Sequence, residues 1–182
     1  MAPPRPYGHS PRKRGETKIR NSCFKAGEMT ETSFTIVPAT SAEDIDAIKA
    51  LILEYNRILD VDLCFQGFQE EMRDFPATYE LVLGARRAQQ MIGCVCLKRL
   101  DAATCEMKRL FVDPPAQGLG IGRALCVALI ERARLVGYSQ MKLDSLKRLK
   151  PATALYCSLG FKETAPYNPN PEPDVVYFAL PL

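Results

Sequence analysis

The chain has 182 residues, of which 47% are hydrophobic, and a formal net charge of +3. This length fits one folded domain with a sizeable core and is short for two. Seven Lys or Arg residues are accompanied only by Glu16 and Glu28 in the first 30 positions, so the rest of the chain is close to neutral. A neutral body lacks the concentrated basic face that phosphate binding needs, and we expect no nucleic-acid partner.

Apolar stretches and cysteines bear on the compartment of the protein. The longest apolar stretch, in the 124–130 region, is far shorter than the roughly 20 residues of a membrane span, so we expect no membrane partner. The seven cysteines form an odd, scattered set without CxxC spacing, and most lie in apolar segments. We expect them to be buried, reduced thiols of a cytoplasmic protein.

Residues 1–32 differ in composition from the rest of the chain. They hold four prolines and the basic cluster Arg12-Lys13-Arg14, with almost no apolar periodicity. Such a segment cannot bury enough surface to fold, and we expect a disordered arm ahead of a domain at 33–182. The alternatives are a nuclear-localisation-like patch, which would add a nuclear location, an organelle presequence, or a start at Met29.

The first half of the chain combines strand patterns with two helical ones. A β-rich run at 33–37 precedes Ser41 and a helical apolar period at 45–59. A second, shorter helix is expected at 65–75, where Pro76 ends it. Three strands follow, at 79–86, 91–99 and 104–112, the first two separated by a polar turn.

The second half opens with a glycine-spaced loop and continues with alternating helices and strands. We expect a helix from about 120 to 135 closed by Gly137, then a strand at 141–143, a helix at 151–159, and strands opening at 160 and covering 175–180. The order βααβββαβαββ predicts a single mixed α/β domain without internal repeats.

Three glycines at alternate positions mark the loop Gln117-Gly118-Leu119-Gly120-Ile121-Gly122-Arg123. Glycine lets the backbone approach a ligand, and the N-terminus of the following helix presents unpaired N–H groups and a positive dipole end, which suit a diphosphate. The P-loop pattern is absent because no GK[ST] ends the loop. The dinucleotide fingerprint lacks its third glycine, although Asp144 stands where its acidic residue would be. A helix cap with flexible glycines is the other alternative.

Three motifs follow one another along the chain: Leu110-Phe111-Val112-Asp113-Pro114, then Gln117-x-x-Gly120-x-Gly122, then Ala154-Leu155-Tyr156-x-x-Leu159-Gly160-Phe161. Together they resemble the GNAT superfamily of N-acetyltransferases, over roughly residues 34–182. The resemblance implies an α/β fold with a central, mostly antiparallel sheet of six to seven strands and about four helices. It also implies a bulged fourth strand that is splayed from the fifth.

The resemblance further implies that acetyl-CoA binds as cosubstrate, without a metal. In that family the loop amides hold the pyrophosphate, and the fourth strand pairs with the pantetheine arm. On this sequence the cofactor-binding residues are Leu110, Phe111, Val112, Gln117, Gly118, Leu119, Gly120, Ile121, Gly122 and Arg123. Leu149 departs from the family, many of whose members carry an asparagine there. His9, the only histidine, lies in the arm, so we expect no histidine-ligated metal in the domain.

Acyl transfer from a thioester to an amine needs a neutral amine and a proton for the leaving thiolate. Glu106 matches the strand-four glutamate that some GNAT enzymes use as base. Its alternative role is a structural charge that neutralises Lys108 or Arg109. The resemblance gives Tyr156 the general-acid role, whereas periodicity alone would favour a packed core tyrosine.

Direct attack by the amine is expected, because no histidine is available to activate Cys157 as a nucleophile. A backbone N–H near Phe111 or Val112 would stabilise the oxyanion.

Segments 60–74 and 167–171 occupy the places where GNAT folds build the acceptor pocket. Charges that could hold an amine or a carboxylate lie there or on the fourth strand: Glu70, Glu71, Asp74, Arg73, Lys108 and Arg109. We therefore expect acetyl transfer to the primary amine of a small molecule, an amino acid or amine, by a monomer or homodimer. Two alternatives stay open: a protein or peptide N-acetyltransferase, and a non-catalytic acyl-CoA-binding module.

Overall fold

The structure, a computed structural model, describes residues 33–59 and 67–182. The predicted N-terminal arm, with its basic cluster and Met29, lies outside the described residues, as do residues 60–66 of the predicted acceptor segment. Among the described residues, no helix is long and apolar enough to cross a membrane.

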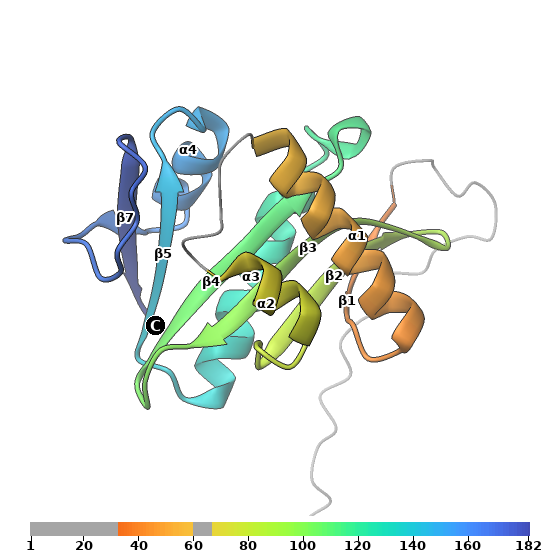
Figure 1. Cartoon of the computed structure of the whole chain (residues 1–182), viewed down its shortest axis with the longest axis horizontal. Helices are drawn as coiled ribbons and strands as arrows, with labels where there is room; N and C mark the ends of the chain where they lie inside the picture. The colour runs from red at the N-terminus through yellow and green to blue at the C-terminus, as the bar shows by residue number, and fades with distance from the viewer. Residues whose placement is uncertain (1–32, 60–66) are drawn as a thin grey trace, which may run out of the picture. The chain divides into compact units, whose positions relative to one another are not determined.

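The described residues form a seven-stranded sheet in the order β1-β2-β3-β4-β5-β7-β6 (Figure 1). All neighbouring strands are antiparallel except β4 and β5, which are parallel. The strands are β1 Thr35–Pro38, β2 Leu81–Arg87, β3 Gln90–Arg99, β4 Thr104–Val112, β5 Gln140–Leu146, β6 Lys162–Glu163 and β7 Val175–Pro181. The predicted α/β class and mostly antiparallel sheet are confirmed.

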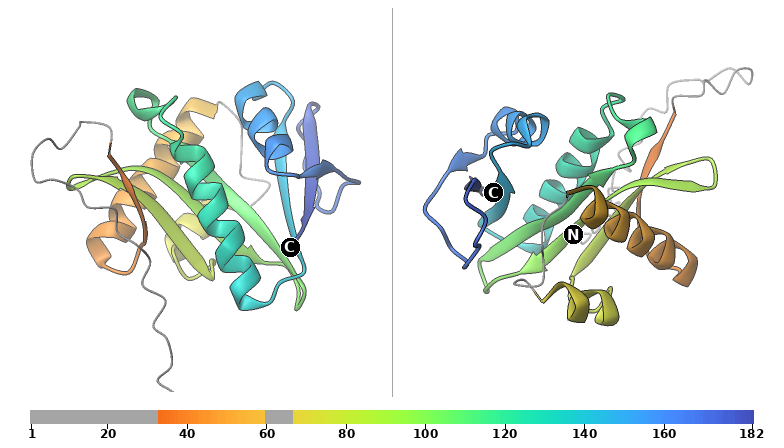
Figure 2. Two further views of the ribbon diagram at one scale, coloured as in Figure 1. Left: turned by 180° about the vertical axis from the view of Figure 1, so that it is seen from behind. Right: turned by 45° about the horizontal axis from the view of Figure 1, so that its top comes forward.

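Helices cover both faces of this sheet. They are α1 Ala42–Leu59, α2 Phe68–Asp74, α3 Ile121–Val136 and α4 Lys150–Ser158. Figures 1 and 2 show α1 and α2 over one face, α3 over the other, and α4 beside the end of β5. The predicted order of elements is confirmed, with a short 3-10 helix, Pro114–Ala116, added between β4 and α3.

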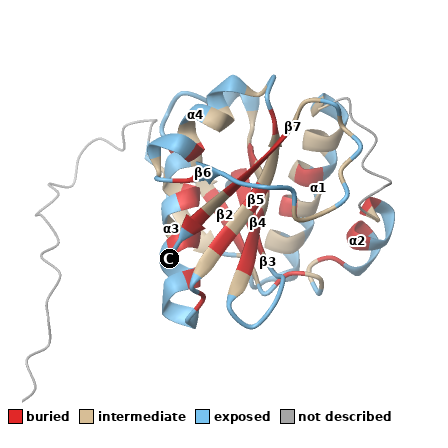
Figure 3. Ribbon diagram, turned by 90° about the vertical axis from the view of Figure 1, so that its left-hand side faces the viewer, coloured by how far each residue is buried: buried red, intermediate tan, exposed pale blue. Residues whose placement is uncertain are grey.

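Each face of the sheet buries its own hydrophobic cluster. Along β3, Cys94 and Cys96 belong to the cluster under α1 and α2, whereas Val95 and Leu97 belong to the cluster under α3. This alternation follows from the period of two in a strand. In Figure 3 the buried positions accordingly lie on the strands and on the inward faces of the helices.

The sequence explains where α1 and α3 begin and where α3 ends. The Ser41 hydroxyl accepts a hydrogen bond of 3.1 Å from the Asp44 N–H and caps α1. Helix α3 starts after Gly120 and stops at Gly137, whose φ angles of 78° and 102° are left-handed. Glycine adopts this conformation without strain, so the two glycines fix the length of the helix.

Strand β5 is longer than the predicted 141–143. Asp144 pairs with Tyr177 of β7, and Leu146 pairs with Val175. Backbone pairing with a full-length neighbour outweighs the low strand propensity of an aspartate. The extension carries Asp144 toward the open end of the strand.

Candidate active site

Strands β4 and β5 pair over a short stretch and then diverge. Their pairs run from Thr104 and Gln140 to Glu106 and Lys142, although both strands continue further. The predicted splay is thus confirmed. Beyond Glu106, the β5-facing edge of β4 has no backbone partner in β5.

A cavity of about 800 Å³ occupies this divergence. It is lined by Tyr55 of α1 from one face of the sheet, by Ile121 of α3 from the other, and by Tyr156 of α4. Elements from both faces of the sheet therefore border the cavity between β4 and β5. Its volume is in the range of sites for small-molecule ligands.

Strand β4 carries a bulge where it borders the cavity. Between Cys94 and Cys96 the partner strand β3 advances two residues, while β4 advances three, from Phe111 to Lys108. The bulge includes Arg109, whose φ of 57° is unusual for a residue other than glycine. The predicted bulge is confirmed, and it interrupts the ladder at the cavity wall.

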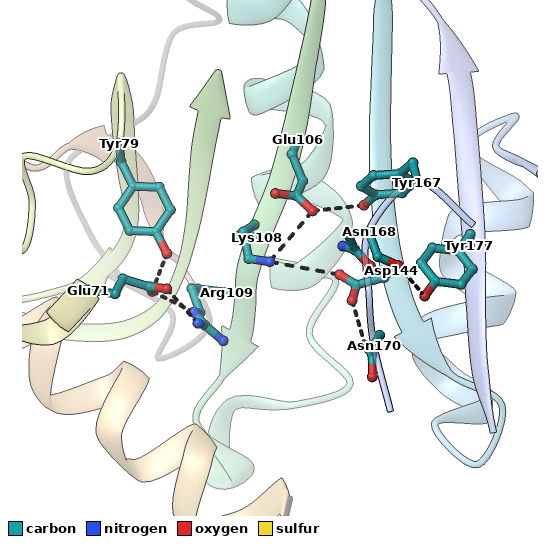
Figure 4. Close-up of polar contacts among 10 residues, drawn as sticks. All are labelled: Glu71, Tyr79, Glu106, Lys108, Arg109, Asp144, Tyr167, Asn168, Asn170 and Tyr177. Carbon is teal, nitrogen blue, oxygen red and sulfur yellow. Dashed lines mark hydrogen bonds and ion pairs between the residues drawn. The ribbon is translucent and has the colours of Figure 1, made fainter. Parts of the chain in front are cut away.

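Helix α2 holds Arg109 in this conformation. The guanidinium of Arg109 donates hydrogen bonds of 2.8 and 2.7 Å to the two carboxylate oxygens of Glu71, which belongs to α2. The Tyr79 hydroxyl donates to the same carboxylate (Figure 4). The guanidinium also lies 5.0 Å from the centre of the Phe68 ring. Burial alone would raise the pKa of Glu71, but the hydrogen bonds and charge of Arg109 lower it. Glu71 and Arg109, which the sequence analysis named as possible contacts for an acceptor, thus form an ion pair with each other.

The glycine loop, residues 117–123, borders the cavity next to the start of α3. Gly118 and Gly120 have φ angles of 80° and 78°, and a Cβ atom at either position would meet no atom of the described residues within 4 Å. The backbone is therefore open to a ligand here. The first turn of α3, which follows directly, presents N–H groups that have no partner within the helix.

Two side-chain hydrogen bonds tie the loop and α3 to their neighbours. Gln117 Nε2 donates to the Val112 carbonyl at 3.0 Å, and an Arg123 guanidinium nitrogen donates to Ser158 Oγ at 2.6 Å. All predicted cofactor-binding residues except the exposed Leu119 line the cavity: Leu110, Phe111, Val112, Gln117, Gly118, Gly120, Ile121, Gly122 and Arg123. The structure thus brings one predicted set together at one site.

Tyr156 is buried in the core and also borders the cavity. Its ring packs against Phe161 and Phe178, with ring centres 6.0 Å away in each case. Burial raises the pKa of its hydroxyl well above the ordinary value. The structure thus places Tyr156 both in the core and at the cavity, and its role as general acid stays a prediction.

Glu106 is buried, but it is not among the described residues that line the cavity. Its Oε1 accepts a hydrogen bond of 2.8 Å from the Tyr167 hydroxyl and lies 3.5 Å from Lys108 Nζ. These contacts are those of a structural charge. Its use as a base stays a prediction.

Unlike Glu106, Asp144 lines the cavity, as does Glu172, and the sequence did not indicate Asp144 as a catalytic candidate. It was weighed only as the acidic residue of a dinucleotide fingerprint. The signal that could have found it is its place at the end of β5, next to the splay. Asn170, from the predicted 167–171 segment, donates a hydrogen bond of 2.8 Å to Asp144 and also lines the cavity.

Other predicted residues lie away from the cavity or take a different place in it. Arg73 pairs with Asp74 at the surface, and neither lines the cavity. Cys157 is exposed and does not line it either. Leu149 sits at the start of α4 and lends the cavity an apolar side chain where many family members have an asparagine.

Comparison with known proteins gives consistent matches. A model of the acetyltransferase (GNAT) domain matches residues 78–163. An uncharacterized N-acetyltransferase of Schizosaccharomyces pombe is 38% identical over 160 residues, which cover 85% of this chain and 98% of the relative. The crystal structure of an acetyltransferase from Streptococcus agalactiae has a TM-score of 0.70 at 20% identity, covering 82% of this chain and 98% of that one. A GNAT family acetyltransferase from Elizabethkingia anophelis with acetyl-CoA bound has a TM-score of 0.60 at 21% identity, with the same coverage. These two structures share the fold.

Proposed function

Given that this chain belongs to the GNAT family of N-acetyltransferases, we propose that it transfers an acetyl group from acetyl-CoA to the primary amine of a small molecule. The observation that carries the proposal is the cavity where β4 and β5 diverge. The glycine loop borders it at one end, and Tyr156, Lys108 and Asp144 border it between the strands.

The donor end of the cavity fits acetyl-CoA. Gly118 and Gly120 leave open space beside the first turn of α3, whose N–H groups and dipole favour a diphosphate. The edge of β4 around Leu110 has no partner in β5, so this edge can pair with the amides of a pantetheine arm. A related fold holds acetyl-CoA, which supports the same donor here.

The chain's own groups can carry out direct transfer. The amine nitrogen forms a bond to the thioester carbonyl carbon, the C–S bond breaks, and Tyr156 gives its proton to the sulfur. A backbone N–H near Phe111 or Val112 would stabilise the oxyanion. The raised pKa of Tyr156 keeps its hydroxyl protonated, so it can donate a hydrogen bond and then its proton to the sulfur as the C–S bond breaks.

Contacts of the 164–174 segment support a small acceptor. Tyr167 is hydrogen-bonded to Glu106, and Asn170 is hydrogen-bonded to Asp144, so this segment is fixed beside the splay. Arg148 adds an ion pair with Asp174. A protein substrate needs an extended open groove, whereas this fixed segment narrows the approach between β4 and β5.

Acetyl-CoA consumption, read as release of free thiol, tests the proposal across amino acids, polyamines, aminosugars, arylamines and lysine peptides. Turnover with one class of small amine, lost in Tyr156→Phe, is the expected result. Turnover with lysine peptides alone would redirect the proposal to a protein acceptor. Tight acetyl-CoA binding without turnover on any amine would favour a binding module.

A further inference from the structure

Two carboxylates from neighbouring strands, the buried Glu106 and the partly buried Asp144, share one lysine where β4 and β5 diverge. Lys108 Nζ lies 3.5 Å from Glu106 Oε1 and 3.9 Å from Asp144 Oδ1. The three side chains are 9%, 4% and 11% exposed, respectively, and Figure 4 shows the lysine between the two acids. One ammonium group balances only one of two carboxylates, so the cluster carries a formal excess of one negative charge.

The two carboxylates face different surroundings. Asp144 and Lys108 line the cavity, whereas Glu106 is not among the described residues that do. Glu106 is hydrogen-bonded to Tyr167 through the same oxygen that faces the lysine. Asp144 uses Oδ2 for its hydrogen bond from Asn170, and its Oδ1 lies beyond hydrogen-bond distance from the lysine. Among the described residues no donor is hydrogen-bonded to Asp144 Oδ1, so this oxygen keeps free lone pairs in a residue that lines the cavity.

The negative charge of Asp144 also acts on the Tyr156 hydroxyl. Burial is the main cause of the raised pKa of Tyr156, and the negative charge of Asp144 adds to it. The two side chains reach one cavity from β5 and from α4. One of them can accept a proton and the other can donate one, as acyl transfer to an amine requires.

We propose that Asp144, in place of Glu106, binds the amino group of the acceptor and accepts its proton. This inference rests on the proposed function. The acceptor arrives as an ammonium ion, because alkylamines have a pKa of about 10, and the excess negative charge attracts it.

The amine nitrogen loses two protons in this reaction and forms one bond to carbon. One N–H bond of the ammonium breaks, and its proton passes to Asp144. The freed lone pair forms the bond to the thioester carbonyl carbon, the C–S electron pair goes to sulfur, and the Tyr156 proton follows it. The second proton lost by nitrogen restores Tyr156, and Asp144 releases its proton to solvent. Lys108 and Asn170 position the Asp144 carboxylate.

The test compares Asp144→Asn with Glu106→Gln, two isosteric changes at carboxylates that share Lys108. Thiol release is measured with an amine that the wild type accepts. We expect kcat/KM to fall about 100-fold for Asp144→Asn. For Glu106→Gln we expect a fall of less than about threefold, because the amide oxygen still accepts the Tyr167 hydrogen bond. Asp144→Glu, which keeps the charge, should retain more activity than Asp144→Asn.

A second readout separates proton acceptance from a merely structural role. A hydrazide or alkoxyamine analogue of the same acceptor is already neutral at pH 7 and needs no base. Asp144→Asn should lose far less activity with this analogue than with the alkylamine. Acetyl-CoA binding and thermal unfolding of each variant are measured in parallel and should resemble those of the wild type.

A larger loss in Glu106→Gln than in Asp144→Asn would overturn the inference, and so would equal losses with the amine and its neutral analogue. If Asp144→Asn does not fold, Asp144→Glu is compared with Glu106→Gln instead. Full activity of Asp144→Glu together with an inactive Glu106→Gln would overturn the inference. If the wild type accepts no amine of the panel, the proposed function itself is contradicted. That outcome is distinct from a failure of this inference, because it does not depend on the variants.

Discussion

The guanidinium of Arg109 donates two hydrogen bonds to the carboxylate of Glu71, a residue 38 positions earlier in the chain. The pair joins α2 to the bulge of β4, and the residues that follow the bulge line the cavity. Because both groups are buried, neither can turn to water when its partner is lost. The pair therefore fixes the shape of the cavity wall.

Glu71→Gln is expected to lower the free energy of unfolding by about 3 kcal/mol, because Arg109 would become a buried charge without a counter-ion. Urea unfolding curves measure the loss. Tyr79→Phe removes one hydrogen bond to the same carboxylate and leaves the ion pair intact, so it serves as the control, with an expected loss of about 1 kcal/mol. Equal losses in the two variants would show that the ion pair does not hold the bulge.

Tyr156→Phe is expected to lower kcat about 100-fold while leaving the dissociation constant of acetyl-CoA unchanged. The phenylalanine ring keeps the packing against Phe161 and Phe178, so only the proton donor is removed. Tyr138→Phe is the matched control, because the Tyr138 hydroxyl donates to Glu80 and does not line the cavity. A kcat for Tyr156→Phe within about twofold of wild type rules out the general-acid role.

Gly120→Ala and Gly137→Ala form a second matched pair, one at each end of α3. Both glycines have left-handed φ angles and open space around the missing Cβ, so each alanine should cost about 1 kcal/mol of stability. Only Gly120 lines the cavity. We expect calorimetric titration to show weaker acetyl-CoA binding in Gly120→Ala and unchanged binding in Gly137→Ala. Unchanged affinity in both would place the donor away from this loop.

Local sequence signals predicted the elements and the donor end of the site. Alternating apolar residues located β3, and Gly120 and Gly137 located the ends of α3, because these signals depend on residues close together in the chain. The loop residues from Gln117 to Arg123 are likewise contiguous, and they reach the cavity together.

The acceptor side of the cavity was harder to predict, because its contacts join residues far apart in sequence. Lys108 lies between Glu106 and Asp144 only because β5 runs parallel to β4, and no periodicity reports that pairing. The Arg109 contact with Glu71 depends in the same way on where α2 packs. These charged residues can be listed from the sequence, but which of them pair with each other is determined only by the folded structure.

Buried thiols should make the protein sensitive to alkaline pH. Burial raises the pKa of Cys94 to about 12, and likewise that of Cys126 to about 12. An unfolded chain exposes these thiols, which then ionise near their ordinary pKa of about 8.5. Between the two values the unfolded state binds fewer protons than the folded state, so stability falls as the pH rises. Below about pH 8 these groups make no difference, because both states are protonated.

Each such thiol should lower the free energy of unfolding by about 1.4 kcal/mol per pH unit above about pH 9. Urea unfolding in the presence of a reductant at a series of pH values measures this slope. Cys94→Ala leaves a cavity and lowers stability at every pH, so the slope is the quantity to compare, and it should be shallower than in the wild type by one thiol's share. Cys157→Ala, which removes an exposed thiol, is the control. Parallel slopes for wild type and Cys94→Ala would mean that Cys94 ionises equally readily in the folded and unfolded chains, against its complete burial under α1.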